Sequence, residues 1–134
     1  MASLAVITAV KARLAGFPTP LRWPNESART PANGSTFVTV QFPVATEEQI
    51  SFGAPGANVF REEGAIRFVI SARRGVGPER AAEIAEDLRA LFRNARFDGV
   101  RCYAPSSPVF DDRGDDAGYF LAAIVVPYDH DTFA

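Results

Sequence analysis

The chain has 134 residues, of which 47% are apolar and 22% charged, and its formal net charge is -2. This composition predicts a single domain over residues 1–134 with a core of its own, and the slight acidity excludes a protein that grips nucleic acid by neutralising phosphates. One cysteine, Cys102, excludes an internal disulfide, and the N-terminal apolar run is too short for a membrane span and lacks the basic start of a signal peptide.

The N-terminal third is predicted to form a helix, an extended arm and a loop. Residues 3–14 carry apolar residues and alanines at helical spacing, and Gly16 is expected to end that helix. Two prolines then favour extended backbone, so residues 21–25, Leu-Arg-Trp-Pro-Asn, are predicted as a short strand or arm. The polar run 26–35 is predicted to be an exposed loop.

Three meandering strands are predicted next. Residues 37–42 are strongly β-prone and end at Pro43, residues 49–53 are expected to be their hairpin partner, and residues 45–48 the turn. Residues 60–72 form the third strand. Its alternation places three apolar side chains on the face that is expected to meet a helix: Ile66, Phe68 and Ile70.

An amphipathic helix follows the turn Gly75-Val76-Gly77. Pro78 stands where a first helical residue is expected, and Glu79 places an acid beside the positive end of the helix dipole. The apolar residues of this segment recur at spacings of three and four, which predicts one core-facing stripe: Ala81, Ile84, Ala85, Leu88, Leu91 and Phe92.

The C-terminal third is predicted to be mostly strand. A short strand is expected between residues 97 and 105, and a long one over 118–128 that is apolar on both faces, as in the interior of a sheet. The tail 129–134 is expected to fray. Together these elements predict an α+β fold, a mostly antiparallel sheet of six or seven strands with two helices packed on one face.

Three polar groups invite chemical interpretation. Four aspartates cluster between residues 111 and 116, but their spacing does not fit a calcium loop, and a solvated hairpin tip is preferred to a divalent-metal site: Asp111, Asp112, Asp115 and Asp116. Arg73 and Arg74 precede a glycine turn, where they suit a partner's carboxylates better than a phosphate. His130 lies between two aspartates in the expected tail, which offers no fixed catalytic geometry.

No nucleophile-elbow motif is present, so nothing in the sequence supports a hydrolase. No enzyme, metal site or cofactor is predicted. Trp23, the only tryptophan, is either a core anchor or an interface residue.

Several short motifs, taken in order, resemble the tail terminator, or tail-completion, proteins of long-tailed bacteriophages and of phage-like particles including gene transfer agents. After a leading helix come Leu21-Arg22-Trp23-Pro24-Asn25, the strand 37–42 and Gln49-Ile50-Ser51-Phe52-Gly53. Glu63-Gly64-Ala65-Ile66-Arg67, the glycine turn, the amphipathic helix and the final strand ending in Val126-Pro127-Tyr128 complete the series.

This resemblance implies a structural virion protein of the tail and neck, made in the bacterial cytoplasm. Such proteins form a homo-hexameric ring that caps the head-proximal end of the tail tube, stops its polymerisation and meets a head-completion (stopper) or connector protein. DNA transits the ring without specific binding, and no membrane is involved.

A ring requires head-to-tail contact between two different patches of one subunit. The candidate interface residues lie in the Trp23 arm, in the arginine pair and in the acidic turn: Arg22, Trp23, Asn25, Arg73, Arg74, Asp111, Asp112, Asp115 and Asp116. The arginine pair and the acidic turn are expected to meet across subunits. The alternative is a monomeric module that binds a small ligand or peptide on the sheet face opposite the helices; a divalent-metal hydrolase is a weaker third.

Overall fold

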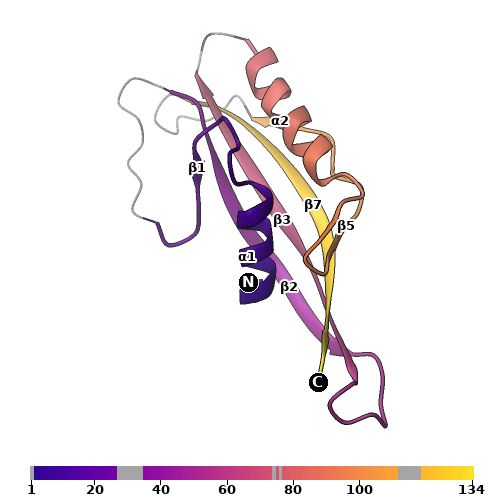
Figure 1. Ribbon diagram of the computed structural model, residues 1–134. Helices are drawn as coiled ribbons and strands as arrows, with labels where there is room; N and C mark the ends of the chain where they lie inside the picture. Colours follow the sequence, from indigo (N-terminus) through magenta and orange to yellow (C-terminus); the bar gives the residue numbers. More distant parts are fainter. Residues whose placement is uncertain (1, 27–34, 74, 76, 112–118) are drawn as a thin grey trace.

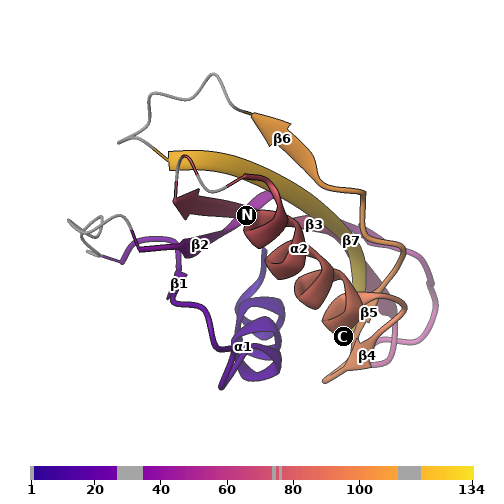
Figure 2. The same ribbon diagram turned by 90° about the horizontal axis from the view of Figure 1, so that it is seen from above.

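The computed structural model describes residues 2–26, 35–73, 75, 77–111 and 119–134. Within these residues it contains two helices and seven strands, which confirms the predicted α+β fold (Figures 1 and 2). The elements in chain order are α1 (Leu4–Arg13), β1 (Leu21–Arg22), β2 (Phe37–Gln49), β3 (Val59–Arg73), α2 (Glu79–Phe92), β4 (Arg96–Phe97), β5 (Val100–Cys102), β6 (Val109–Asp111) and β7 (Tyr119–Phe133).

The strands form one sheet in the order β1-β2-β3-β7-β5-β4, and β6 also pairs with β7. Only β1 and β2 run parallel; the other described pairs are antiparallel. β3 and β7 pair along their whole lengths, from Val59 opposite Phe133 to Arg73 opposite Tyr119. β5 and β6 lie on the other side of β7, at opposite ends of that strand.

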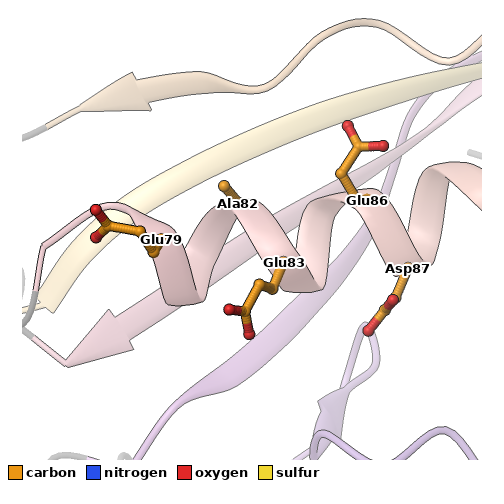
Figure 3. A pocket seen from close by; sticks show the side chains of 5 residues that line it. All are labelled: Glu79, Ala82, Glu83, Glu86 and Asp87. Carbon is orange, nitrogen blue, oxygen red and sulfur yellow. The ribbon is translucent and has the colours of Figure 1, made fainter.

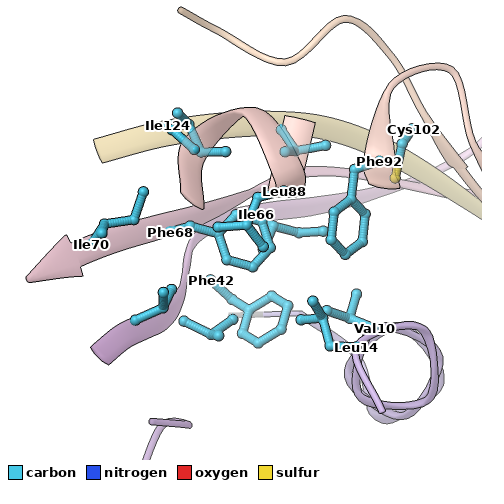
Figure 4. Packing of buried hydrophobic residues seen from close by; sticks show 14 of the residues in the cluster. Val10, Leu14, Phe42, Ile66, Phe68, Ile70, Leu88, Phe92, Cys102 and Ile124 are labelled. Carbon is cyan, nitrogen blue, oxygen red and sulfur yellow. The ribbon is translucent and has the colours of Figure 1, made fainter. Parts of the chain in front are cut away.

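Both helices cover the same face of the sheet, and one hydrophobic cluster joins them to it (Figures 2 and 4). β3 contributes Ile66, Phe68 and Ile70, each with no exposed surface, as its alternation predicts. The ring centroids of Phe68 and Phe92 lie 5.3 Å apart, which locks α2 onto the middle of the sheet.

The predicted stripe of α2 is confirmed. The side chains at its core-facing positions are at most 1% exposed, apart from a partly buried Leu91: Ala81, Ile84, Ala85, Leu88 and Phe92. α1 packs through Val6, Ala9 and Val10, whereas Leu4 is 79% exposed.

The expected meander between residues 37 and 58 is wrong, because β2 continues through Pro43 to Gln49 as one strand. Its register with β3 shifts between Gln41 and Val44, so Pro43 lies in a β-bulge where the ladder does not need an N–H. A Cβ on Gly64 would lie 2.4 Å from the carbonyl oxygen of Val44, so this close approach of β3 to β2 requires glycine. The hairpin therefore turns over residues 50–58 instead of 45–48.

The expected frayed tail is also wrong, because β7 extends to Phe133 beside the first half of β3. Ala134 then accepts a hydrogen bond from the N–H of Asn58 and donates one to its carbonyl, both at 2.9 Å. The tail is ordered because arginines from β3 and β5 neutralise its aspartates, a long-range effect that its polar sequence does not show.

The single short strand expected after α2 is instead a small hairpin. β4 and β5 meet at a tight turn in which Asp98 and Gly99 have φ angles of 47° and 81°. This is the left-handed backbone that an Asp-Gly pair favours. The predicted exposed loop over 26–35 and the acidic connection lie largely outside the described residues.

Candidate functional site

The sheet has two unlike edges that, within the described residues, carry no strand partner on their outer side. The first, which we call the β1–β2 edge, consists of β1 and of β2 from Val44 to Gln49, since β1 pairs only with Val38 and Thr39. The second, the β6–β4 edge, consists of β6 and β4. Unpaired strand edges are templates for pairing with another chain.

The two edges lie on opposite sides of the sheet, and residues of one edge are in register with residues of the other across the strands between them. At one end, the register runs from Arg22 of β1 through the sheet to Val109 of β6. At the other end, it runs from Thr46 of β2 to Arg96 of β4. Figure 2 shows β1 and the start of β2 at one side of the molecule and β5 and β4 at the other. Among the described residues, the chain thus has two different unpaired edges on opposite sides of its sheet.

The predicted interface residues Arg22, Trp23 and Asn25 lie at the β1–β2 edge. The guanidinium of Arg22 lies 4.8 Å from the ring centroid of Phe37, and Lys11 Nζ lies 5.1 Å from that of Trp23. Trp23 is half-buried and touches the core, so it is partly the anchor that the sequence allowed. Asn25 is exposed and has a φ of 61°.

Arg73 is exposed at the last position of β3, and the backbone of Asp111 ends β6. Because Arg73 pairs with Tyr119 and Asp111 with Leu121, both residues stand at the same end of one subunit's sheet. Arg74, Asp112, Asp115 and Asp116 lie outside the described residues. The pairing of the arginines with the acidic turn across subunits stays a prediction.

A polar cluster fixes the far end of the sheet on the face away from the helices. Arg61 donates two hydrogen bonds to the carboxylate of Asp131, at 2.8 and 3.1 Å, and this contact holds the pKa of Asp131 below its ordinary value. Arg101 and the hydroxyl of Tyr103 both donate to Asp129, which is 5% exposed. The hydrogen bond to Asp129 raises the pKa of Tyr103. These paired charges stabilise β7, and because their polar atoms already have partners, few of them remain to bind a ligand.

A second polar contact lies beneath the sheet, on the helix side. Glu62 is 5% exposed, and its Oε2 accepts hydrogen bonds from Tyr128 at 2.6 Å and from the N–H of Ser3 at 3.2 Å. Burial opposes ionisation of Glu62, but these hydrogen bonds outweigh it and lower its pKa. Burial and the same carboxylate raise the pKa of Tyr128. The contact ties the start of α1 to two strands.

His130 does not form an acid–base group with its neighbours in the chain. It lies within β7, where successive side chains point to opposite faces, so Asp129 and Asp131 face away from it. Its Nδ1 is buried without a hydrogen-bond partner among the described residues.

The exposed side of α2 carries a shallow acidic hollow of about 440 Å³, shown in Figure 3. It is lined by Glu79, Ala82, Glu83, Glu86 and Asp87. Two of its acids are already paired within the helix, Glu83 with Arg80 at 3.3 Å and Glu86 with Arg89 at 2.5 Å. These i,i+3 pairs are typical of a solvated helix face.

Other chemistry is scarce in the part of the chain that the structure describes. His, Cys, Asp and Glu form no group of three or more there that could hold a metal ion, and the aspartates at 112–116 lie beyond it. No helix in the same part has the length and apolar character needed to cross a bilayer. Cys102 is 2% exposed, and burial raises the pKa of its thiol to about 11, so it is the buried thiol that the sequence indicates.

Sequence reasoning missed the charged residues at the β2 end of the β1–β2 edge and at the β4 end of the β6–β4 edge. Glu47 and Glu48 are exposed on β2, in the segment that was expected to be a turn. Arg93, which precedes β4, and Arg96, which begins it, are exposed as well. The charges themselves are visible in the sequence. Their placement on opposite edges depends on the strand order and the bulge at Pro43, which local patterns do not contain.

Comparison with known proteins gives one family match and a shared fold. The family described as phage tail terminator protein matches residues 5–128 of the chain. No curated protein matches it. Twelve chains of solved structures do match, and one of them is 21% identical, with a TM-score of 0.66 over 100% of this chain and 99% of its own. At that identity the likeness shows a shared fold.

Proposed function

The chain belongs to the phage tail terminator family, and from this membership we propose that it caps the head-proximal end of a tail tube as a ring of six subunits. In this role it stops tube polymerisation and joins the tail to a head-completion or connector protein. DNA passes through the opening without specific binding, which suits a chain with a formal net charge of -2. The site of action is the virion or phage-like particle.

The observation that carries this proposal is the family match over residues 5–128. The two unlike edges of the sheet support the ring, because head-to-tail contacts between different patches close into rings, whereas a two-fold dimer uses one patch twice. No catalytic role is needed, since the function consists of binding and of blocking further subunit addition.

A polymerisation assay tests this function. Tail tube protein of the same particle is polymerised with and without the purified chain, and tube ends are imaged by electron microscopy. The proposal predicts a cap at one end only and tubes that stop growing once capped. Chain bound along the tube wall, or tubes that lengthen unchanged, would refute it. A chain that stays monomeric and ignores tubes would instead favour the ligand-binding module.

A further inference from the structure

We propose that the far ends of the two edges form the subunit contact of the ring: the acidic β2 segment of one copy lies against the basic β4 corner of the next. The acidic segment is Thr46, Glu47 and Glu48, and the basic corner is Arg93 and Arg96. This inference rests on the ring proposed above and names the surfaces that close it.

The two surfaces carry opposite charges. Glu47 and Glu48 are exposed and have no ion pair among the described residues. On β3, Glu63 stands opposite Thr46, and Arg61, which stands opposite Glu48, is already paired with Asp131. Arg93 and Arg96 are likewise exposed and without an ion pair in the described part, with Asp98 as the nearest acid along the chain. Opposite charges on the two surfaces favour contact of the acidic β2 segment with the basic β4 corner of the next subunit. They disfavour contact between two acidic segments or between two basic corners.

The two surfaces also match in level and in strand direction. Thr46, Glu63, Asp129, Arg101 and Arg96 stand at one level across β2, β3, β7, β5 and β4. The strands alternate in direction, so β2 and β4 point the same way, and a neighbour rotated about a ring axis would place its β2 parallel to this β4. Neither strand has a partner on its outer side in the part of the chain that the structure describes, so the sheets of adjacent subunits meet edge to edge.

The hollow on α2 argues against a different self-contact for the acidic segment. Of the acids that line it, Glu79 and Asp87 have no ion pair among the described residues. They would repel an acidic segment, since like charges brought together cost free energy. The β4 corner is a described surface of opposite sign, and it lies on the far side of the sheet, where a ring requires it.

Disulfide trapping tests the contact, because the fold forbids the same bond within one chain. β2 and β4 are separated by four interstrand steps of about 4.8 Å, or roughly 19 Å, whereas a disulfide needs Cα atoms within about 7 Å. Three double variants carry Arg96→Cys together with Thr46→Cys, Glu47→Cys or Glu48→Cys. The wild-type chain, whose only thiol is the buried Cys102, reports the background.

Each variant is oxidised as assembled on tube ends and run on a non-reducing gel. We expect at least one β2 position to give a ladder of linked chains up to six. Arg96→Cys with Asp87→Cys, on the exposed side of α2, is the matched control and should give none. Rings without a ladder from any of the three β2 positions would overturn this contact while leaving the ring intact. No ring in the wild type would overturn the proposed function itself, so the two failures are distinct.

Charge reversal gives a second readout that does not need a bond to form. Glu47→Lys with Glu48→Lys, or Arg93→Glu with Arg96→Glu, should each weaken ring assembly at least tenfold at low salt. The chain with all four changes should recover most of that loss, because the charges are again opposite. The contact would be contradicted if both double variants and the fourfold variant assembled as well as the wild type. It would also be contradicted if the fourfold variant assembled no better than the double variants.

Discussion

Replacing Tyr128 by phenylalanine isolates one buried hydrogen bond. The phenol is 2% exposed and donates to Glu62 at 2.6 Å, so the change removes the donor and little packing. The carboxylate keeps only the N–H of Ser3, at 3.2 Å. A hydrogen bond to a charged group contributes about 1.5–3 kcal/mol. We therefore expect the free energy of unfolding at pH 7 to fall by about 2 kcal/mol, or the melting temperature by about 6–10 °C.

The pH dependence of this loss follows from the lowered pKa of Glu62. Between the folded pKa and the ordinary value of 4.5, the unfolded chain binds more protons, so stability from this group is present above pH 4.5 and is lost as pH falls through the folded pKa. Tyr128→Phe removes one of the hydrogen bonds that lower the pKa of Glu62. The difference between wild type and variant should therefore shrink below pH 4.5.

Urea unfolding followed by circular dichroism measures both effects, at one protein concentration because assembly would itself stabilise the chain. Glu62→Gln and the double variant Tyr128→Phe with Glu62→Gln complete a double-mutant cycle. The cycle separates the interaction free energy of Tyr128 with Glu62 from the contacts that each residue makes with its surroundings. A variant within 0.5 kcal/mol of wild type at pH 7, or a difference that stays constant from pH 7 to pH 3, would refute the reasoning.

Two further substitutions and one labelling experiment test the fold. Gly64→Ala places a Cβ 2.4 Å from the carbonyl oxygen of Val44, so thermal unfolding should show a loss of about 1–3 kcal/mol; no loss would mean that the bulge adapts freely. Phe92→Ala empties the space beside Phe68 and should cost about 3–5 kcal/mol in urea unfolding, and a cost under 1 kcal/mol would contradict the packing of α2. Cys102, with a pKa of about 11, should resist iodoacetamide at pH 8 until the chain unfolds, and rapid alkylation of the native protein would show an open core.

The elements best predicted from sequence are those whose pattern is local and long. α2 has a complete stripe and an acid in its first turn, and β3 alternates cleanly over Ile66, Phe68 and Ile70. Their packing followed because each had one apolar face to bury. The helix-covered sheet could be inferred from these two elements.

The errors arose where distant residues override a local signal. Pro43 normally ends a strand, but a bulge opposite Gly64 lets β2 continue. The polar tail resembles a frayed end, but Arg61 and Arg101 hold Asp131 and Asp129 within β7. Neither partner can be identified from neighbouring sequence.

The candidate site was only partly predictable for the same reason. The motifs that resemble tail terminators include the arm at Arg22 and Trp23, which does lie at a sheet edge. The charged β2 and β4 edges depend on the order of five strands and on their register. A strand shifted by one residue would place Glu48 on the other face of the sheet.

The central claim, a ring of six at the tube end, is tested most directly by native mass spectrometry of the chain, both free over a wide concentration range and released from capped tubes. The account predicts a species of about 87 kDa, six times the chain mass of 14.5 kDa, in the material released from tubes. A closed dimer in both samples would contradict it. In a two-fold dimer both subunits use the same edge, so no head-to-tail contact is left to close a ring.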